Sequence, residues 1–276
     1  MTERLVTREA HEIEDEVRQL RAANQQLTLN ALEAQRRESM ATAAYRQQAA
    51  FLVTVAHELR NPLLPLRLAA QMLSRARTDD TALAELQATI TSQVSDMSRL
   101  INDLLDGSRV STGKFRLERT VVDVGSLIHL AVRTCTDVIE ERKHRLSISM
   151  PDAPVKVLGD RLRLVQVFNN LIGNAAKYTL PGGEISIGVS IQGAEVAVSM
   201  KDNGTGISPE ALPHIFELYA QDVHVEGVAS GGLGIGLAVV RELVTAHEGS
   251  VVAFSDRERG GSEFVVRLPL ATVALA

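Results

Sequence analysis

The sequence predicts an α+β chain, in which a long helical N-terminal part precedes a mixed C-terminal part. Apolar residues repeat in heptads over residues 6–34, and apolar spacings of three and four then recur as far as Leu104. From about residue 115, short segments in which apolar and polar residues alternate, as in strands, are interspersed with amphipathic helical segments. We therefore expect a coiled coil and a helical hairpin, followed by a two-layer α/β sandwich.

Composition excludes several classes of protein. The 276 residues are 45% hydrophobic, which is enough for one or two domains with real cores. A net charge of −5 indicates no nucleic-acid surface. The single cysteine, Cys135, excludes an internal disulfide and a cysteine-based metal cluster. Because no apolar run approaches about 18 residues, we expect no membrane span and a soluble, cytoplasmic protein.

Residues 1–40 are predicted to form a coiled-coil helix. Asn24 occupies an a position, where a buried polar residue favours a parallel dimer in one register. Glu38 interrupts the seam, which resumes in phase at Tyr45. The alternative is a single amphipathic helix packed on the body of the protein. The seam consists of Val6, Ala10, Ile13, Val17, Leu20, Asn24, Leu27, Ala31 and Ala34.

Residues 41–108 are predicted to form two antiparallel helices. Pro62 and Pro65 should bend the first helix, and the polar segment Thr78–Thr81 should turn the chain. Two such helices cannot bury both apolar stripes alone, so a homodimer should complete a four-helix bundle. The second stripe contains Leu83, Leu86, Ile90, Val94, Met97, Ile101 and Leu104.

A linker is expected at residues 109–114, within the Gly- and Ser-rich stretch from Gly107 to Gly113. The sandwich should occupy residues 115–270, and residues 271–276 form a tail. Asp160 should cap a helix that ends near Tyr178, whereas Arg161 and Arg163 are interpreted as surface charges. Further helices are expected at residues 124–139, 209–216 and 234–247, and strands at 146–150, 155–158, 184–191, 195–201, 251–255 and 263–268.

One turn of the first hairpin helix combines a nucleophile with a base. The heptad phase places His57 at an f position, pointing into solvent. Glu58 can accept the proton from one ring nitrogen while the other attacks an electrophile. Asn61 follows four residues later on the same helix face. A solvated surface histidine is the alternative, so the rest of the chain has to decide between the two.

Four motifs follow in the C-terminal part. They are Gln166–Thr179 (QVFNNLIGNAAKYT), Asp202–Ile207 (DNGTGI), Ile215–Glu217 (IFE) and Gly231–Leu237 (GGLGIGL). With the His57 segment, they resemble the H, N, G1, F and G2 boxes of sensor histidine kinases in the order of that family. The resemblance covers roughly residues 40–270. It implies a dimerisation and phosphotransfer domain, followed by an ATP-binding domain of the type that gyrases and Hsp90 chaperones share.

The resemblance also implies the roles of residues on one helix. Asn170 and Asn174 share a helix face, and their amide oxygens suit Mg²⁺. Asn174 is implied as the direct metal ligand, with Asn170 beside it. Lys177 can reach a phosphate as a point charge, and Tyr178 can lie along the nucleotide.

The remaining boxes are implied to complete an ATP site. Asp202 would accept a hydrogen bond from the adenine amino group. Glycines allow the backbone to approach the nucleotide closely, and those at a helix start favour phosphate. Residues 218–231 should form a lid, and Phe216 should either anchor that lid or lie in the core. The glycines are Gly204, Gly206, Gly232, Gly234 and Gly236.

We therefore expect an ATP- and Mg²⁺-dependent kinase that phosphorylates His57 and passes the phosphoryl group to an aspartate of a response-regulator receiver domain. The resemblance also implies that Asn61 can orient a water for hydrolysis of a phosphorylated response regulator, so the kinase could also act as a phosphatase. Two alternatives remain open: a non-catalytic, nucleotide-binding dimeric scaffold, and an ATPase of the gyrase or chaperone type. The ATPase would need a water-activating glutamate on the helix that carries Asn170, and Asn170 is a poor base.

Overall fold

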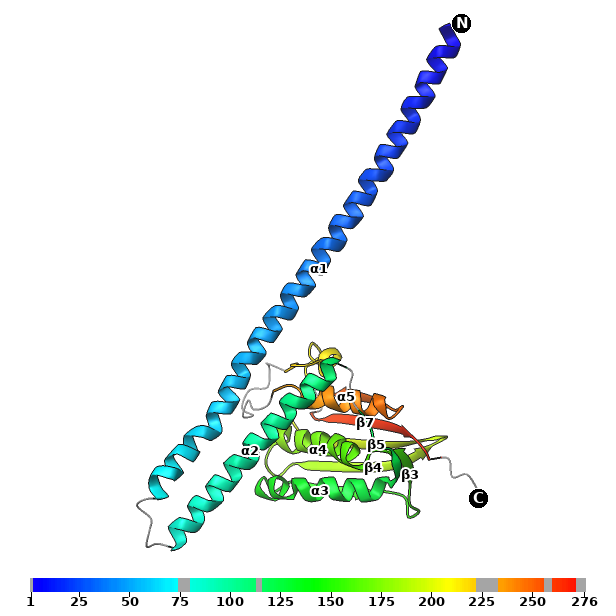
Figure 1. Cartoon of the computed structure of the whole chain (residues 1–276). Helices are drawn as coiled ribbons and strands as arrows, with labels where there is room; N and C mark the ends of the chain where they lie inside the picture. Colours follow the sequence, from blue (N-terminus) through cyan, green and yellow to red (C-terminus); the bar gives the residue numbers. More distant parts are fainter. Residues whose placement is uncertain (1, 74–79, 113–115, 222–232, 256–259, 272–276) are drawn as a thin grey trace. The chain divides into compact units, whose positions relative to one another are not determined.

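The computed structural model describes residues 2–73, 80–112, 116–221, 233–255 and 260–271. The chain divides into two compact units, Met1–Val53 and Thr54–Ala276. The first unit is helical throughout its described length. The second contains the end of that helix, a second long helix and an α/β domain (Figure 1).

Helix α1, Thr2–Leu73, is continuous through the predicted coiled-coil and histidine segments. Pro62 and Pro65 lie inside the helix and do not end it. The seam residues Leu20 and Leu27 are exposed on the single chain, as an unpartnered coiled-coil face would be. The coiled-coil dimer and the four-helix bundle remain predictions, whereas the hairpin of α1 and α2 followed by a sandwich is confirmed.

Helix α2, Asp80–Thr112, is longer than the sequence predicted. The expected linker at residues 109–114 is helical as far as Thr112, and its domain boundaries stay a prediction. Gly107 is buried in this helix, and a Cβ there would lie 3.1 Å from Cδ1 of Ile235. Packing of the α2 backbone against Ile235 explains why a glycine is found in a helix interior rather than at its end.

A five-stranded sheet forms one layer of the C-terminal domain. Its strand order is β2-β4-β5-β7-β6, with β2 parallel to β4 and all other pairs antiparallel. Gly193, with φ of +65°, occupies the turn of the predicted β4–β5 hairpin. The strands are β2 Arg145–Ser149, β4 Glu184–Gln192, β5 Glu195–Asp202, β6 Ser250–Ser255 and β7 Ser262–Pro269.

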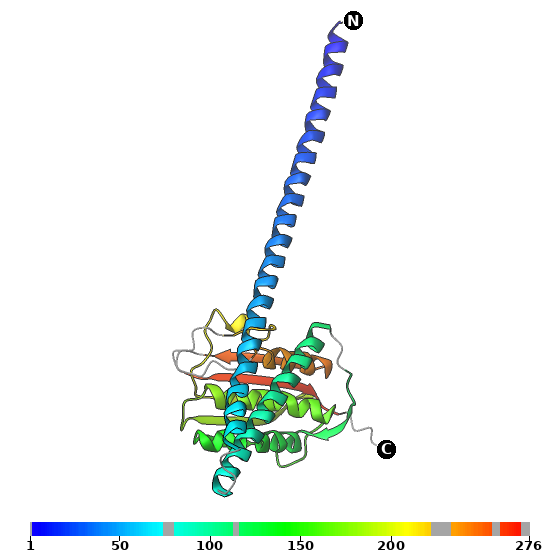
Figure 2. The same cartoon turned by 60° about the vertical axis from the view of Figure 1, so that its left-hand side comes forward.

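Three helices form the second layer, on one face of the sheet (Figures 1 and 2). They are α3 Val124–Glu141, α4 Arg161–Tyr178 and α5 Gly236–Ala246. Apolar residues recur on one face of each helix, and β4 alternates buried with less buried positions. The core between the layers includes Leu127, Ile128, Phe168, Leu171, Ile185, Ile187, Val198, Met200, Leu243 and Val266.

Two elements differ from the prediction. The four-residue strand β1, Thr120–Asp123, was not expected, and it pairs antiparallel with β3, Lys156–Gly159. The helix expected at residues 209–216 is only a 3₁₀ turn, η1, Leu212–His214. Pro213 lacks the N–H that an α-helix would donate to the carbonyl of Pro209, which disfavours an α-helix in this short segment.

Candidate nucleotide and phosphoacceptor sites

The phosphoacceptor candidate lies on α1. His57 is exposed, as its predicted f position implies, Asn61 is also exposed, and Glu58 is half-buried. Pro62, directly after Asn61, is buried. The turn therefore presents an imidazole and an amide to solvent on one helix face, with a carboxylate adjacent in sequence.

Helix α4 carries most of the predicted nucleotide residues. Asp160 begins the helix as predicted, because its Oδ1 accepts the backbone N–H of Arg163 at 3.1 Å. Asn170 and Asn174 are half-buried on the same face. Nζ of Lys177 lies 3.2 Å from the hydroxyl of Tyr178 and 4.7 Å from its ring centroid.

The N-terminus of α5 meets α4 at this face. Nδ2 of Asn170 donates to the carbonyl of Gly236, the first residue of α5, at 3.4 Å. Gly234 has φ of +67°, and a Cβ there would lie 2.7 Å from the Ala220 carbonyl oxygen, so only glycine fits. Gly232 lies outside the described residues. Ile235, the N-cap of α5, makes no side-chain cap, which leaves the first N–H groups available to an anion.

The turn after β5 closes the site beside Tyr178. The carboxylate of Asp202 is buried and accepts the Gly204 N–H at 2.9 Å and the Ser262 hydroxyl at 2.6 Å. Gly206 has φ of +70°. A Cβ on Gly204 would lie 2.3 Å from the Tyr178 carbonyl oxygen, so this turn fits only a glycine. Each carboxylate oxygen of Asp202 retains a lone pair for a further donor.

These three segments converge through direct contacts. The Thr205 N–H donates to the Tyr178 carbonyl at 3.1 Å, and the Asn170 amide reaches Gly236. Residues far apart in sequence thus form one site with neutral amides, a lysine, a buried carboxylate and an uncapped helix start. This set of donors and acceptors fits a purine nucleotide with its phosphates and a hard cation.

His247 fixes α5 against the start of α4. Its Nδ1–H donates to the Leu243 carbonyl at 2.7 Å, and its Nε2 accepts the Asp160 N–H at 2.9 Å. Burial lowers the pKa of His247, although its hydrogen bond to Leu243 opposes that shift. The ring is therefore a neutral connector between the two helices of the site.

Phe216 contacts the sheet. Its ring meets that of Phe264 on β7 edge-on, with centroids 6.3 Å apart. The predicted lid, residues 218–231, lies outside the described residues from 222 onward.

Sequence reasoning missed a polar cluster between α2 and α4. Arg163, interpreted as a surface charge, is only 26% exposed, and its Nη1 lies 3.3 Å from Oδ1 of Asp106. Nε2 of Gln166 donates to Oδ2 of Asp106 at 2.6 Å, and Nη1 of Arg109 donates to Oδ1 at 2.8 Å. One signal was available: an arginine in the first turn opposes the helix dipole, which indicates an acidic partner from elsewhere.

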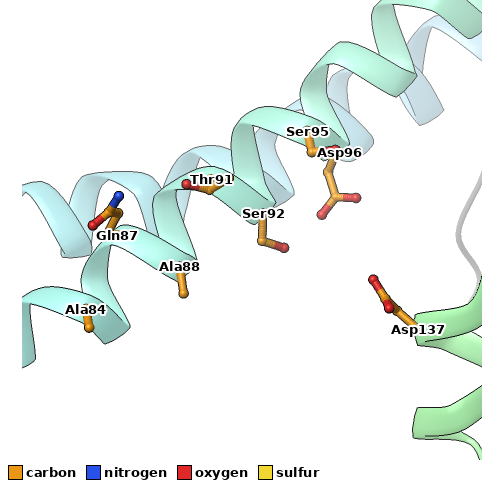
Figure 3. Close-up of a pocket in the computed structure, with 8 residues that line it drawn as sticks. All are labelled: Ala84, Gln87, Ala88, Thr91, Ser92, Ser95, Asp96 and Asp137. Atoms are coloured by element: carbon orange, nitrogen blue, oxygen red, sulfur yellow. The ribbon is translucent and has the colours of Figure 1, made fainter. Parts of the chain in front are cut away.

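A separate hollow lies between α2 and α3 (Figure 3). Asp96 of α2 and Asp137 of α3 both point into it. None of the predicted nucleotide residues lines this hollow. Its lining is Ala84, Gln87, Ala88, Thr91, Ser92, Ser95, Asp96 and Asp137.

Comparisons with known proteins agree with the geometry. Residues 47–113 match the His Kinase A (phospho-acceptor) domain, and residues 159–272 match the histidine kinase-, DNA gyrase B-, and HSP90-like ATPase family. The probable sensor histidine kinase TcrY of Mycobacterium tuberculosis is 34% identical over 221 residues, which are 80% of this chain and 45% of TcrY.

Two solved structures share the fold. Full-length ShkA, in complex with AMPPNP, aligns with a TM-score of 0.59 at 28% identity over 81% of this chain and 46% of ShkA. The histidine kinase ThkA, in complex with the response regulator TrrA, aligns with a TM-score of 0.54 at 24% identity over 81% of this chain and 63% of the ThkA chain.

The chain belongs to the sensor histidine kinases, with a phosphoacceptor domain followed by an ATP-binding domain of the gyrase and Hsp90 type. It spans about half the length of the curated relatives it matches. Within the part of the chain that the structure describes, no helix is both long and apolar enough to cross a membrane.

Proposed function

We propose that this protein uses ATP to phosphorylate its own His57 and then transfers the phosphoryl group to an aspartate of a response-regulator receiver domain. The observation that carries the proposal is the pairing, in one chain, of an exposed histidine in a phosphoacceptor domain with an ATP-binding domain in which α4, the turn after β5 and the start of α5 meet. The solved complex of ThkA with TrrA supports the choice of partner.

In this proposal, three segments hold the nucleotide. Asp202 accepts the adenine amino group, and Gly204 and Gly206 let the backbone approach the ring. Lys177 binds a phosphate oxygen, and Tyr178 lies along the nucleotide. Gly232, Gly234 and Gly236 bring backbone N–H groups to the phosphates at the start of α5.

Mg²⁺ is proposed to bind through the amide oxygen of Asn174, with Asn170 beside it. The ion would offset phosphate charge during transfer. Nδ2 of Asn170 donates to the Gly236 carbonyl, so Oδ1 of Asn170 remains available on the helix face that Asn174 shares.

The proposed chemistry occurs on one turn of α1. One ring nitrogen of His57 attacks the γ-phosphorus in line, the bond to the β–γ bridging oxygen breaks, and ADP leaves. Glu58 accepts the proton from the other ring nitrogen, so the phosphorylated imidazole remains neutral. Asn61, exposed one turn later, is proposed to orient water when a phosphorylated regulator is hydrolysed.

A homodimer is proposed through the hairpin. Large apolar side chains remain exposed on both helices of the single chain, and apolar surface that gathers in this way is typical of a protein–protein interface. A second hairpin would cover them in a four-helix bundle. The exposed side chains are Leu63, Leu64, Leu68, Met72, Val94, Ile101 and Leu105.

The test is incubation with γ-labelled ATP and Mg²⁺, comparing the wild type with His57→Gln and with His129→Gln. His129 is also an exposed helical histidine, but it lies on α3, so it serves as a matched control. We expect acid-labile, base-stable label in the wild type and in His129→Gln, and none in His57→Gln. ATP hydrolysis without label would favour an ATPase, whereas nucleotide binding without label or hydrolysis would favour a scaffold.

A further inference from the structure

The C-terminal end of α4 is held by groups from outside the helix. The last four carbonyls of an α-helix have no partner within it. Here the Ala175 carbonyl accepts the Thr179 N–H, and the Tyr178 carbonyl accepts the Thr205 N–H. The carbonyls of Ala176 and Lys177 lie between these two, and both are bound by side chains.

The two side chains come from the short loop between α3 and β2. Nη1 of Arg142 donates to the Lys177 carbonyl at 3.0 Å, and Nε2 of His144 lies 3.0 Å from the Ala176 carbonyl. His144 is 8% exposed. Because a carbonyl oxygen only accepts, the Nε2 atom must carry the hydrogen of this ring. In both contacts the side chain is the donor; the Arg142 hydrogen bond is part-buried and the His144 hydrogen bond is buried.

A continuing α-helix could not replace the Arg142 bond. A continuing helix would supply the N–H of residue 181 to the Lys177 carbonyl, but residue 181 is Pro, which has no N–H. The loop is also fixed, since the Gly182 N–H donates to the Arg142 carbonyl and the Arg145 N–H donates to the Gly183 carbonyl. Lys143 has φ of +55°, and the chain reverses there so that both flanking side chains reach α4.

Arg142 and His144 together form what we call the Arg142–His144 clamp. The helical turn that this clamp binds is the last turn of α4, which carries Lys177 and Tyr178. At the same helix end, the Tyr178 carbonyl accepts a hydrogen bond from the Thr205 N–H and leaves no space for a side chain at Gly204. A shift of this helix end would therefore move the lysine, the tyrosine and the turn after Asp202 together. Among the described residues, Arg142 and His144 form no hydrogen bond with Asp202 or Gly204.

We propose that Arg142 and His144 are positioning residues for the nucleotide site, acting through the last-turn carbonyls of α4. The inference rests on the proposed ATP binding. Loss of His144 leaves a buried carbonyl unsatisfied, and loss of Arg142 leaves a part-buried one. Either loss allows the end of α4 to relax, so the bound nucleotide loses contacts with Lys177 and with the Asp202–Thr205 turn. The effect is on affinity, because neither side chain contacts His57.

The experiment measures the KM for ATP and the kcat of autophosphorylation in the full chain, together with the Kd for ADP by calorimetry. The test variants are Arg142→Met and His144→Leu. Their matched controls are Arg133→Met and His129→Leu, at exposed positions on α3. We expect the KM and Kd of the test variants to rise about fivefold to thirtyfold, with kcat at saturating ATP nearly unchanged. The controls should match the wild type.

A conservative variant separates positioning from general destabilisation. His144→Gln can still donate from its Nε2 amide, so it should recover most of the affinity that His144→Leu loses. Unfolded protein would instead lower the apparent kcat and leave KM unchanged, and that result would overturn the inference. Unchanged KM and Kd in both test variants would overturn it as well. A wild type that binds no nucleotide would overturn the proposed function itself and the inference with it.

Discussion

Gln166 of α4 donates a hydrogen bond to the carboxylate of Asp106 on α2, with 2.6 Å between Nε2 and Oδ2. The same carboxylate is bound by Arg163 and Arg109 and is almost fully buried. A buried charge with several charge-assisted hydrogen bonds is costly to disrupt from one side. This contact connects the phosphoacceptor hairpin to the helix that bears the nucleotide residues.

Substitution of Asp106 should therefore destabilise the protein. We expect Asp106→Asn to lower the free energy of unfolding by about 1–3 kcal/mol. Two arginines lose their carboxylate partner, and the NH₂ group of the new asparagine faces another donor, either Gln166 or an arginine. The measurement is calorimetric unfolding, with hydrogen exchange of residues 100–112. Asp96→Asn is the control, because Asp96 is about half exposed and lies 3.8 Å from Arg99. Equal effects of the two substitutions would contradict the prediction.

Asp103 should make stability depend on pH. Burial raises the pKa of Asp103 from 3.8 to about 6; Arg99 opposes the shift and Asp106 adds to it. The native state thus binds a proton more readily than the unfolded state, so stability falls as pH rises from about 4 to about 6. Asp103→Asn should raise the Tm at pH 7.5 and have little effect at pH 4. A Tm gain of the same size at both pH values would exclude the charge of Asp103 as its cause.

Two glycines should respond to alanine with opposite signs. A Cβ on Gly173, within α4, would meet nothing within 4 Å, so Gly173→Ala should stabilise the protein by about 0.5–1 kcal/mol. At Gly204 a Cβ would collide with the Tyr178 carbonyl, so Gly204→Ala should lower both the Tm and the affinity for ADP. Thermal unfolding with and without ADP measures both effects. Stabilisation by alanine at Gly204 would show that the turn can open without cost.

Asp202 should decide which base is bound. Asp202→Asn can keep its hydrogen bond to the Gly204 N–H, and the Ser262 hydroxyl can rotate to accept from the new amide. The fold should survive, but one acceptor facing the nucleotide becomes a donor. We expect ATP affinity to fall about tenfold or more, with a smaller change for GTP. Competition of ATP and GTP against a fluorescent nucleotide, with Ser262→Ala as control, tests this. Parallel losses for both nucleotides would indicate a packing defect instead of altered recognition.

The sequence by itself determined the order and type of most elements and the identity of the candidate residues. Helical spacing is local, so it predicted that α4 runs from its Asp160 cap to about Tyr178, with Asn170 and Asn174 on one face. The exposure of His57 followed from heptad phase for the same reason. Short boxes in a fixed order were enough to assign the family.

Tertiary structure decided what depends on partners distant in sequence. The helix α2 continues through Gly107 because Ile235, far along the chain, packs against it. Arg163, expected at the surface, is part-buried and forms an ion pair with Asp106, and the short strand β1 is stabilised by antiparallel pairing with β3. Likewise, Arg142 and His144 bind helix-end carbonyls that follow them by more than thirty residues. Local propensity does not encode such contacts, since their free energy is realised only when the chain closes and water is excluded.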